Sequence, residues 1–533
     1  MAEYIRFIAA GSDALMVELV DLETTLTLLD VLRADPPEGI IELVPAARTL
    51  LVYFDGLITD RAKLVDAISS IDLSFPTIRQ GDTFEIPVIY DGEDLKDIAS
   101  FLGWSIEELI QRHTGATYTV AFTGFAPGFA YMSCDDPNFD IPRRKSPRVR
   151  IPAGSVALGG KFGGIYPSDS PGGWQLLGRT PLKMWNIRRA RPALFAPGDQ
   201  VRFREMMAKG DSVPAAALED SPTKVDGNAE GLRVTRADRP VLYQDLGRSG
   251  QASQGVSQSG ALDRTSLMEA NLCVGNPRNA TAIEITYGGF AVKADQPVTL
   301  AVAGALAPMT IRIADGRSIK APFGQPFALD TGDELRLDFP TEGTRCYLAL
   351  RGGFDVEPFL GSTATDTLAK VGPAPIVAGD ILVPSNDAVS AVDPSRHGRV
   401  ALPKAGDTVT LDVVLGPRTD WFTDKGLTTL LTQEWQVTPE SSRVGMRLAG
   451  GEPLERADST ELPSEGTPLG AIQVPHSGQP VLFLADHPLT GGYPVIGVVA
   501  AHHFDLAGQI PIGAKIRFNA IAPFDPLLRD TAR

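Results

Sequence analysis

Cysteine is scarce in this chain. Three cysteines, Cys134, Cys273 and Cys346, are spread over 533 residues and form no C-x-x-C pair. This spacing supports neither a disulfide framework nor a zinc knuckle. A chain without such a framework is typical of the cytoplasm, and we expect the protein there.

Long apolar runs are also missing. No stretch of about 18 apolar residues occurs, which is the length that a membrane-spanning helix needs. Residues 1–7 show no basic segment followed by an apolar one, so we expect no secretion signal. The sequence therefore predicts a protein with no membrane partner.

Basic residues are outnumbered. The chain carries 49 lysines and arginines against 65 acidic residues, a formal net charge of -16 and a pI near 4.9. A surface of this sign repels the phosphates of nucleic acids. Nucleic acid is therefore excluded as an expected partner.

Glycine and proline are frequent. The chain has 53 glycines and 42 prolines, and over residues 118–203 they separate short hydrophobic runs every eight to twelve residues. Such spacing is typical of a β-barrel or sandwich. The length exceeds what one core fills, so we expect several domains and a mainly β fold with α+β elements.

The beginning of the chain has a different texture. Apolar residues recur at helical spacing over 61–71, and strand-like runs occupy 48–55 and 84–90. These elements predict a small N-terminal α/β domain. Two further helices are expected at 95–104 and 105–113, the second with Ser105 and Glu108 in capping-box spacing.

Residues 207–230 are small and polar and lack periodicity, as linkers do. Beyond them we expect strands and turns again, with one helix over 264–274 that stops at Gly275. The predicted units are an α/β domain at 1–82, a barrel at 83–206, the linker at 207–230, a β-rich domain at 231–400, a second barrel at 401–522 and a tail at 523–533.

The two halves carry a weak internal repeat. DSPGGWQLLG at 169–178 leads to APGDQVRF at 196–203, and DHPLTGGYPVIG at 486–497 leads to PIGAKIRF at 511–518. The match favours two related barrels. Glycine-rich β-proteins also share turn chemistry by chance.

The richest candidate site lies between Lys161 and Trp174, where four glycines allow backbone amides to approach a ligand. The alternative is a turn-rich barrel rim. GGKFGG at 159–164 lacks the ending of a phosphate loop. As catalytic candidates we name Lys161, Tyr166 and Asp169, and as substrate-binding candidates Ser170, Gly172, Gly173 and Trp174.

A basic run follows residue 142. Arg143 and Arg144 head a series that continues with Lys145, Arg148 and Arg150, and arginine forks suit carboxylate or phosphate. We expect Arg143 and Arg144 to bind substrate. A solvated or subunit-contact face is the alternative.

The second half supplies candidates for a composite site. Gln244, Asp245 and Arg248 occupy a glycine-rich loop, and we expect them to bind substrate. Asp486, His487 and Tyr493 stand where the first half has Asp169 and Trp174, and we expect His487 and Tyr493 to bind substrate. Asp486 is a catalytic candidate with His487 as its acid–base neighbour, although adjacent side chains of a strand point to opposite faces.

Histidines give few further candidates. His113 ends a predicted helix and is a candidate general base, with capping or packing as the alternative. The six histidines form no H-E-x-x-H pattern, and neighbouring His502 and His503 chelate poorly if they lie in a strand. We predict no metal site.

Several motifs carry a family resemblance. FTGFAPGFAYM at 122–132, PRRKSPRVRIPAGSVA at 142–157 and IYPSDSPGGWQLLGRT at 165–180 resemble the allophanate-hydrolase-subunit-1 family, which includes the B subunit of 5-oxoprolinase and the kinase inhibitor KipI. VLYQDLGRSG at 241–250, GALDR at 260–264, NLCVGNP at 271–277, ALRGGFDV at 349–356 and GSTATD at 361–366 resemble the subunit-2 family, with the C subunit of 5-oxoprolinase and KipA. The chain resembles a fusion of the two.

The resemblance implies cyclophilin-like β-barrels in both halves, the modules of the urea carboxylase carboxyltransferase domain. It also implies a fused B–C component of an ATP-dependent 5-oxoprolinase, which uses ATP with Mg and opens 5-oxo-L-proline to L-glutamate. The partner in this reaction is the separate LamB/YcsF-type A subunit of 5-oxoprolinase. The small-molecule substrate is then a lactam or amide. The oligomeric state stays open.

Two other functions follow from the same resemblance. One is a biotin-dependent carboxyltransferase acting on urea or a related amide, with biotin on another chain, because no Ala/Val-Met-Lys-Met motif occurs here. The other is a KipI-like regulator of a histidine kinase. Fusion to the second module argues against the regulator, since KipA opposes that inhibitor.

Overall fold

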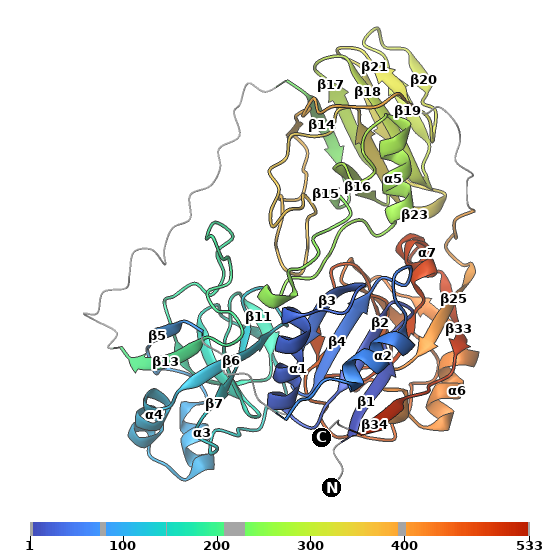
Figure 1. Cartoon of the computed structure of the whole chain (residues 1–533). Coiled ribbons are helices and arrows are strands. Elements are labelled where there is room, and N and C mark those ends of the chain that lie inside the picture. Colours follow the sequence, from blue (N-terminus) through green and yellow to red (C-terminus); the bar gives the residue numbers. More distant parts are fainter. Residues whose placement is uncertain (1–3, 75–80, 145, 207–229, 393–400, 531–533) are drawn as a thin grey trace.

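The computed structural model describes residues 4–74, 81–144, 146–206, 230–392 and 401–530 (Figure 1). The linker expected at 207–230 lies, except for Glu230, outside the described residues. Strands hold 36% of the residues and helices 15%, so the predicted mainly β fold with barrels in both halves is confirmed.

The N-terminal domain is a five-stranded sheet with helices on one side. Its strands run in the order β3-β4-β2-β1-β34. The elements are β1 (Tyr4–Ala9), β2 (Ala14–Glu18), α1 (Leu22–Ala34), β3 (Ile40–Pro45), β4 (Thr49–Phe54), α2 (Arg61–Ser69) and β34 (Leu527–Asp530). Helix α2 begins as predicted, because Asp60 caps the Lys63 amide and Leu64 and Ile68 are buried.

Strand β34 corrects the predicted tail. It pairs antiparallel with β1, and Leu527 lies opposite Phe7. A segment from the end of the chain therefore completes the sheet at its beginning. No local pattern announces this, because pairing over such a sequence distance depends on the rest of the fold.

The first barrel follows. Its seven-stranded sheet has the order β12-β9-β10-β7-β6-β13-β5, and a bridge between Ile89 and Arg179 links its two edges. The elements are β5 (Thr83–Val88), α3 (Leu95–Leu102), α4 (Ile106–Gly115), β6 (Tyr118–Thr123), β7 (Ala130–Cys134), β8 (Arg148–Ile151), β9 (Ser155–Gly159), β10 (Phe162–Ile165), β11 (Ser170–Gly172), β12 (Gln175–Arg179) and β13 (Gln200–Glu205). Ser105 caps α4 at the Glu108 amide, as predicted.

A β-sandwich occupies the middle of the chain. Its sheets have the orders β20-β19-β22-β17-β14-β24 and β15-β16-β23-β18-β21. The elements are β14 (Leu232–Ala237), β15 (Val241–Gln244), η2 (Ala252–Gln254), α5 (Arg264–Cys273), β16 (Ala282–Thr286), β17 (Phe290–Ala294), β18 (Val298–Leu306), β19 (Met309–Arg312), β20 (Ser318–Lys320), β21 (Phe327–Leu329), β22 (Glu334–Leu337), β23 (Glu342–Leu350) and β24 (Ile381–Leu382). Gly275, at φ 79°, ends the region of α5 as expected.

The second barrel is closed, with the order β25-β32-β29-β30-β27-β26-β33. Its elements are β25 (Thr408–Leu415), η3 (Thr419–Trp421), α6 (Asp424–Thr432), β26 (Trp435–Val437), β27 (Gly445–Ala449), β28 (Glu465–Gly466), β29 (Ala471–Gln473), β30 (Val481–Phe483), β31 (Thr490–Gly491), β32 (Val495–Val499), η4 (Ala501–His503), α7 (Phe504–Gln509) and β33 (Lys515–Ala522).

The two barrels share one topology. In each, the first and last strands pair in parallel, β5 with β13 and β25 with β33. The remaining strands follow in the same order, and each barrel adds a small ribbon, β8–β11 or β28–β31. The internal repeat in the sequence therefore reflects two copies of the same barrel.

The N-terminal domain lies between the two barrels (Figure 1). Leu28 and Leu29 of α1 belong to the same buried cluster as Phe122 and Tyr131 of the first barrel. On the second-barrel side, the Arg418 guanidinium pairs with Glu18 at 2.9 Å and with buried Glu465. The first domain therefore connects the two barrels by packing against one and forming ion pairs with the other.

Candidate functional site

The two halves of the chain meet at the loop after β6. The amide of Phe125 donates to Thr490 Oγ1 at 3.1 Å, and the amide of Gly128 donates to the Gln254 carbonyl at 2.9 Å. Thr123 Oγ1 donates to the Ala252 carbonyl at 3.0 Å. The FTGFAPG motif thus serves as the contact between the first barrel and the second half.

Close backbone approach explains two glycines of this contact. A Cβ on Gly124 would collide with Thr490 Oγ1, and one on Gly255 would lie 2.6 Å from the Ala126 carbonyl oxygen. Gly255 also has φ +78°. Phe125 has φ 63°, which is rare for an aromatic residue and is retained only where the surroundings enforce it.

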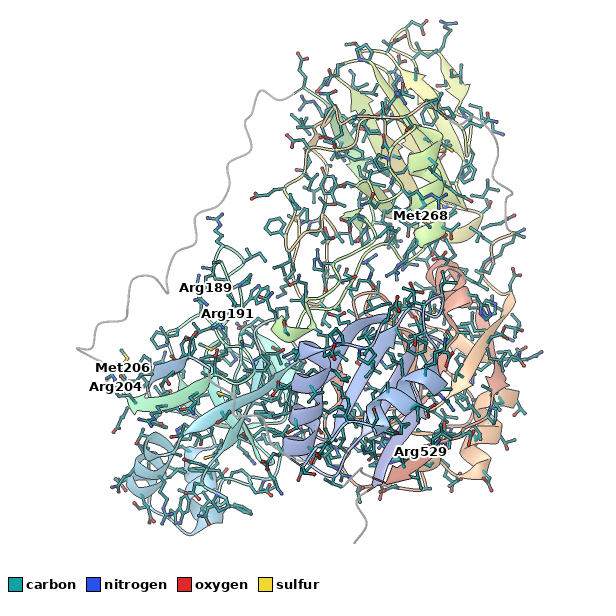
Figure 2. The ribbon with its side chains drawn as sticks, in the orientation of Figure 1. Arg189, Arg191, Arg204, Met206, Met268 and Arg529 are labelled. Atoms are coloured by element: carbon teal, nitrogen blue, oxygen red, sulfur yellow. The ribbon has the colours of Figure 1, made fainter. Side chains whose placement is uncertain are left out.

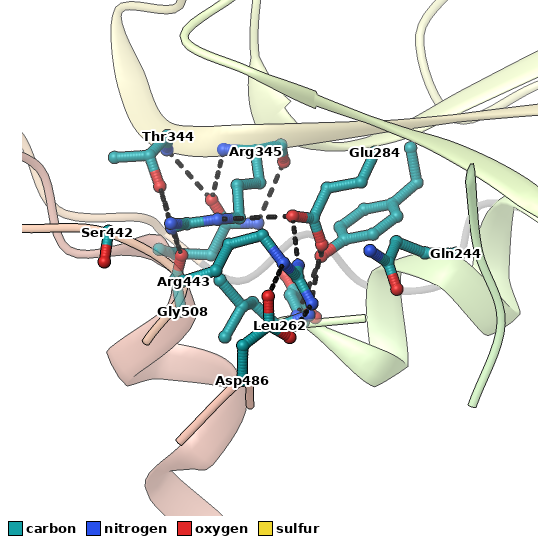
Figure 3. Close-up of polar contacts among 12 residues, drawn as sticks. Gln244, Leu262, Glu284, Thr344, Arg345, Ser442, Arg443, Asp486 and Gly508 are labelled. Atoms are coloured by element: carbon teal, nitrogen blue, oxygen red, sulfur yellow. Dashed lines mark hydrogen bonds and ion pairs between the residues drawn. The ribbon is translucent and has the colours of Figure 1, made fainter. Parts of the chain in front are cut away.

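A buried ion cluster lies between the sandwich and the second barrel (Figure 3). Arg443 pairs with Glu284 of β16 at 2.5 Å and with Asp486 at 2.9 Å. Its Nη2 also donates to the Gly260 carbonyl at 2.6 Å. Glu284 accepts from the Tyr347 hydroxyl at 2.8 Å, so both acids are satisfied without solvent.

Asp486 is fixed on every side. It accepts hydrogen bonds from Ser259 Oγ at 2.7 Å and from the amide and hydroxyl of Thr367 at 2.9 and 2.7 Å. Burial opposes its ionisation, but Arg443 outweighs burial and lowers the pKa of Asp486. We therefore assign Asp486 a structural role, because no lone pair is left to take a proton.

Next to this cluster, two buried side chains have unpaired atoms. Gln244 Nε2 donates to the Thr365 carbonyl at 2.9 Å, whereas its Oε1 has no partner. Arg248 donates to the carbonyls of Phe359 and Ala364, whereas its Nη1 has none. Burial lowers the pKa of Arg248. An unpaired buried donor and acceptor are rare, and a bound water or a polar ligand group would satisfy them.

Asp245 shapes the neighbouring loop rather than opening to a ligand. It accepts from the Gly247 amide at 2.7 Å, from Ser362 Oγ at 2.6 Å and from the Thr363 amide at 2.8 Å. Asp366 lies in this loop, and burial together with the charge of Asp486 raises its pKa. The loop 359–372 is thereby anchored to residues 244–248.

The same loop forms one wall of an open cleft of about 200 Å³. Lys370 and Phe359 line the sandwich side, and Trp185 and Asn186 line the first-barrel side. Lys370 has φ 54°, a strained conformation of the kind that gathers at functional sites. A second cavity, between the sandwich and the second barrel, has about 20 Å³, room for one water.

Lys370 brings positive charge to the lining of this cleft. Lys370 is exposed, and its charge helps to lower the pKa of Asp169 after the Ala153 amide and Arg150. Arg189, labelled in Figure 2, follows the cleft-lining segment and has one nitrogen, Nη1, that is buried without a partner. A small anion or polarised carbonyl in the cleft therefore finds positive charge at Lys370.

The predicted 161–174 region divides into surface and core. Lys161 is exposed in the β9–β10 hairpin, and Asp169 is bound to Arg150 at 2.6 Å on the surface. Ser170 Oγ donates to the Ser168 carbonyl at 2.8 Å. None of these three residues lines either of the two cavities described above.

Tyr166 and Trp174 are core residues. Both rings pack edge-on against Phe129, at 5.3 and 5.4 Å between centroids. Burial raises the pKa of Tyr166. A Cβ on Gly172 would collide with the Tyr166 hydroxyl oxygen, and the Gly173 carbonyl accepts from the Arg144 amide at 2.7 Å. The glycines therefore permit packing, and the barrel-rim alternative describes them better.

The basic run is used internally. Arg143 pairs with Glu461 at 2.8 Å, a contact between the halves, and Arg144 pairs with Asp94 at 2.7 Å. Arg148 binds the same Asp94 at 2.8 Å. Arg143 therefore corresponds to the subunit-contact alternative, whereas Arg144 and Arg148 are paired within the first barrel.

The predicted histidines and Tyr493 also lie apart from the cleft. His113 is buried, stacks on Phe203 at 4.4 Å and shares a hydrogen bond of 2.7 Å with the Tyr90 hydroxyl. Burial lowers its pKa to about 3, so it is neutral. His487 is buried, with Nδ1 3.0 Å from the Pro488 carbonyl. Tyr493 contacts Arg456, with the guanidinium 5.9 Å from its ring centre.

The sequence analysis missed Glu284, Arg443, Asp366 and Lys370. None was singled out by its own side-chain chemistry. Only the sandwich topology brings Glu284 to Arg443, and only the anchored loop turns Lys370 toward the first barrel.

No described helix is long and apolar enough to cross a membrane.

Comparisons with known families match the two halves of the chain separately. Residues 5–195 match the model of the carboxyltransferase domain, subdomains C and D, and residues 254–520 match that of subdomains A and B. The second half is 34% identical to the C subunit of 5-oxoprolinase from Escherichia coli over 54% of this chain and 90% of that protein. The first half is 41% identical to the B subunit of 5-oxoprolinase from Haemophilus influenzae over 31% of this chain and 79% of that protein.

Solved structures agree. The crystal structure of TTHA0988 superposes with a TM-score of 0.80 at 33% identity, over 95% of this chain and 100% of that one. The urea amidolyase of K. lactis matches with a TM-score of 0.50 at 27% identity, over 55% of this chain and 19% of that one. The chain therefore belongs to the carboxyltransferase-domain family, and it joins subdomains C and D to subdomains A and B in a single polypeptide.

Proposed function

We propose that this chain is the fused B–C component of an ATP-dependent 5-oxoprolinase that opens 5-oxo-L-proline to L-glutamate in the cytoplasm. The supporting observation is that one chain matches most of two separate proteins, 79% of a B subunit and 90% of a C subunit. A urea amidolyase of Saccharomyces cerevisiae is matched over only 16% of its length.

The cleft between the halves is the substrate site in this proposal. Opening a lactam requires a cation for the substrate carboxylate and donors for the developing oxyanion. Lys370 supplies an exposed cation, and Trp185 and Phe359 supply apolar walls for a small ring. The strained backbone at Lys370 holds this cation toward the first barrel.

ATP and Mg belong to the complex rather than to a nucleotide site on this chain. Residues 159–164 form the β9–β10 hairpin, and no helix follows them as in a phosphate loop. This segment does not fit a nucleotide, so no step is assigned to ATP on this chain. We propose the separate LamB/YcsF-type A subunit of 5-oxoprolinase as the partner.

The test is glutamate release from 5-oxoproline with ATP, using this protein with and without that partner. Glutamate formed only with both proteins supports the proposal. Lys370→Met should raise KM for 5-oxoproline at least about tenfold, because the substrate carboxylate loses its cation. Lys404→Met, a surface lysine paired with Glu342, is the matched control.

A second candidate is biotin-dependent carboxyl transfer to urea or a related amide. The family models and the matches to urea amidolyase favour it. Biotin would have to arrive on another chain, because this sequence has no biotinylation motif. No glutamate release with a folded and bound partner would refute the oxoprolinase proposal and leave this candidate.

A further inference from the structure

Three potential metal ligands meet on the second barrel, away from the cleft. They are Asp412 of β25 and the neighbouring residues His502 and His503, and their ligand atoms all lie within 4.8 Å of one another. His502 Nε2 lies 3.0 Å from Asp412 Oδ2, and His503 Nδ1 lies 3.9 Å from the same oxygen. The group is partly exposed, so an ion can reach it from solvent.

The local backbone brings the two histidines together. The sequence analysis assumed a strand, in which neighbouring side chains point apart, but the structure has the turn η4 at Ala501–His503. The two rings lie 4.4 Å apart between centroids. Hydrogen bonds from the Ala500 amide to the Asp412 carbonyl at 2.9 Å and from the Ala501 amide to Ser12 Oγ at 3.1 Å hold the turn.

The spacing suits a tetrahedral ion. Zinc bonds of about 2.0–2.1 Å place neighbouring ligand atoms about 3.3 Å apart. The observed separations of 3.0 and 3.9 Å bracket this value. Small side-chain rotations are therefore enough to converge the three atoms on one ion.

The surroundings orient the ligands. Asn519 Nδ2 donates to Asp412 Oδ1 at 2.7 Å, which leaves Oδ2 toward the histidines. The Asp412 amide donates to His503 Nδ1 at 2.9 Å, so Nδ1 is the unprotonated nitrogen of that ring. Coordination through Nδ1 has to replace this hydrogen bond, so the Asp412 amide competes with the ion for the lone pair. The Asn519 bond to Asp412 is the partner that orients a ligand, as is usual in metal sites.

We propose that Asp412, His502 and His503 bind one Zn²⁺ or a similar borderline divalent ion, with water in the fourth position. Two imidazoles and one carboxylate favour such ions over Mg²⁺ and Ca²⁺, which prefer oxygen ligands. The ion ties β25 to the start of α7, where Asp505 binds the Arg264 amide at 2.8 Å. This places the ion next to the sandwich–barrel contact and is independent of the proposed function.

The test is calorimetric titration of Zn²⁺ into tag-free, EDTA-treated full-length protein at pH 7.5. We expect one ion per chain, unaffected by excess Mg²⁺. His502→Ala and Asp412→Asn should each weaken binding by at least about tenfold, since even orienting residues contribute that much. Asn519→Ala should weaken it less than either ligand variant.

His476→Ala is the matched control, because His476 is an exposed histidine outside the group. Absorption of bound Co²⁺ provides a second readout, with bands of a tetrahedral site in the wild type and their loss in His502→Ala. The proposal is overturned if the wild type takes up no zinc, or if His502→Ala and Asp412→Asn bind it as tightly as His476→Ala does.

Discussion

Arg443 is a buried cation that connects two domains of the chain. Its guanidinium is buried between Glu284 and Asp486, and these acids come from the sandwich and the second barrel. A buried charge pair gains little over an apolar packing, but loss of one partner leaves the other charge unpaired. Loss of Arg443 would therefore destabilise the contact between the sandwich and the second barrel.

Arg443→Met should destabilise the protein by about 3–5 kcal/mol, because two buried carboxylates lose their cation. Thermal unfolding followed by circular dichroism measures the loss. Arg447→Met, at an exposed position on β27, is the matched control and should stay within about 0.5 kcal/mol of the wild type. Equal melting temperatures for the two variants would refute the role given to Arg443.

His113 predicts a dependence of stability on pH. Its pKa falls from 6.5 to about 3 on folding, because burial disfavours the charged ring. Below pH 6.5 the unfolded chain binds a proton that the folded chain refuses. The contribution of His113 to the free energy of unfolding is therefore fully present above pH 6.5, and it is lost as the pH falls toward 3.

The substitution His113→Phe removes the titrating group and with it this loss of stability at low pH. Relative to its own value at pH 7.5, the free energy of unfolding of the variant should fall by about 2–3 kcal/mol less than that of the wild type on acidification to pH 4.5. Urea unfolding at the two pH values measures the difference. Parallel pH profiles would show that His113 is protonated in the folded protein.

Sequence alone gave part of this residue-level picture. Gln244, Asp245 and Arg248 were chosen for their glycine-rich loop, and they do lie together beside the cleft-forming loop. Arg443 and Lys370 were missed, because a buried ion pair depends on partners that only the tertiary fold supplies. Side-chain chemistry within a motif predicted proximity but not whether a residue is packed or open.

At the scale of elements, β34 is the strand whose removal has the clearest consequence. It covers the edge of β1 with backbone pairs from Tyr4 to Phe7. An uncovered edge presents unpaired amides and carbonyls and favours association between molecules. The N-terminal sheet depends on this strand for its closed edge.

Truncation after Pro526 should lower the melting temperature and increase aggregation, because β1 loses its neighbour. Circular dichroism during heating measures the melting temperature, and light scattering measures the aggregation. Truncation after Asp530 keeps the strand and is the control. Identical behaviour of the two truncations would show that the pairing contributes nothing to stability.

Elements with local signals were predicted well. Helices α2, α4 and α5 were found from apolar spacing and caps, and the structure shows Asp60, Ser105 and Asp263 as their capping residues. Helix α1 and strand β34 were not predicted. The short β34 has no turn or periodicity of its own, and only its partner β1 makes it a strand.

At the scale of the whole molecule, the contacts between the halves are extensive. Strand β34 pairs with β1, Arg418 binds Glu18, and the β6–β7 loop contacts Thr490. The related B and C subunits of 5-oxoprolinase are separate chains. The two halves of this protein therefore have the surfaces of a stable pair without the linker.

We expect residues 1–218 and 219–533, expressed as two chains, to purify together as a 1:1 complex. Glu18→Gln in the first piece should weaken the complex measurably, because buried Arg418 loses a carboxylate partner. Glu85→Gln, an exposed pair on β5, is the control. Size-exclusion chromatography with light scattering distinguishes the complex from free pieces, and free pieces alone would contradict the prediction.

The shared architecture of the barrels was the strongest whole-molecule prediction. A weak repeat of turn residues was enough to indicate it, because glycine and proline positions follow the bends of the barrel. The position of the N-terminal domain between the barrels was beyond sequence reasoning. Such packing depends on the shapes of finished surfaces, which no local pattern contains.

The pairing of β1 with β34 also affects how the protein is made. A ribosome adds on the order of 5–20 residues per second, so about half a minute or more separates synthesis of β2 from that of β34. During that time the first domain exits the ribosome with an open edge. Chaperone binding to the nascent chain should therefore persist on this domain until the second barrel has been translated.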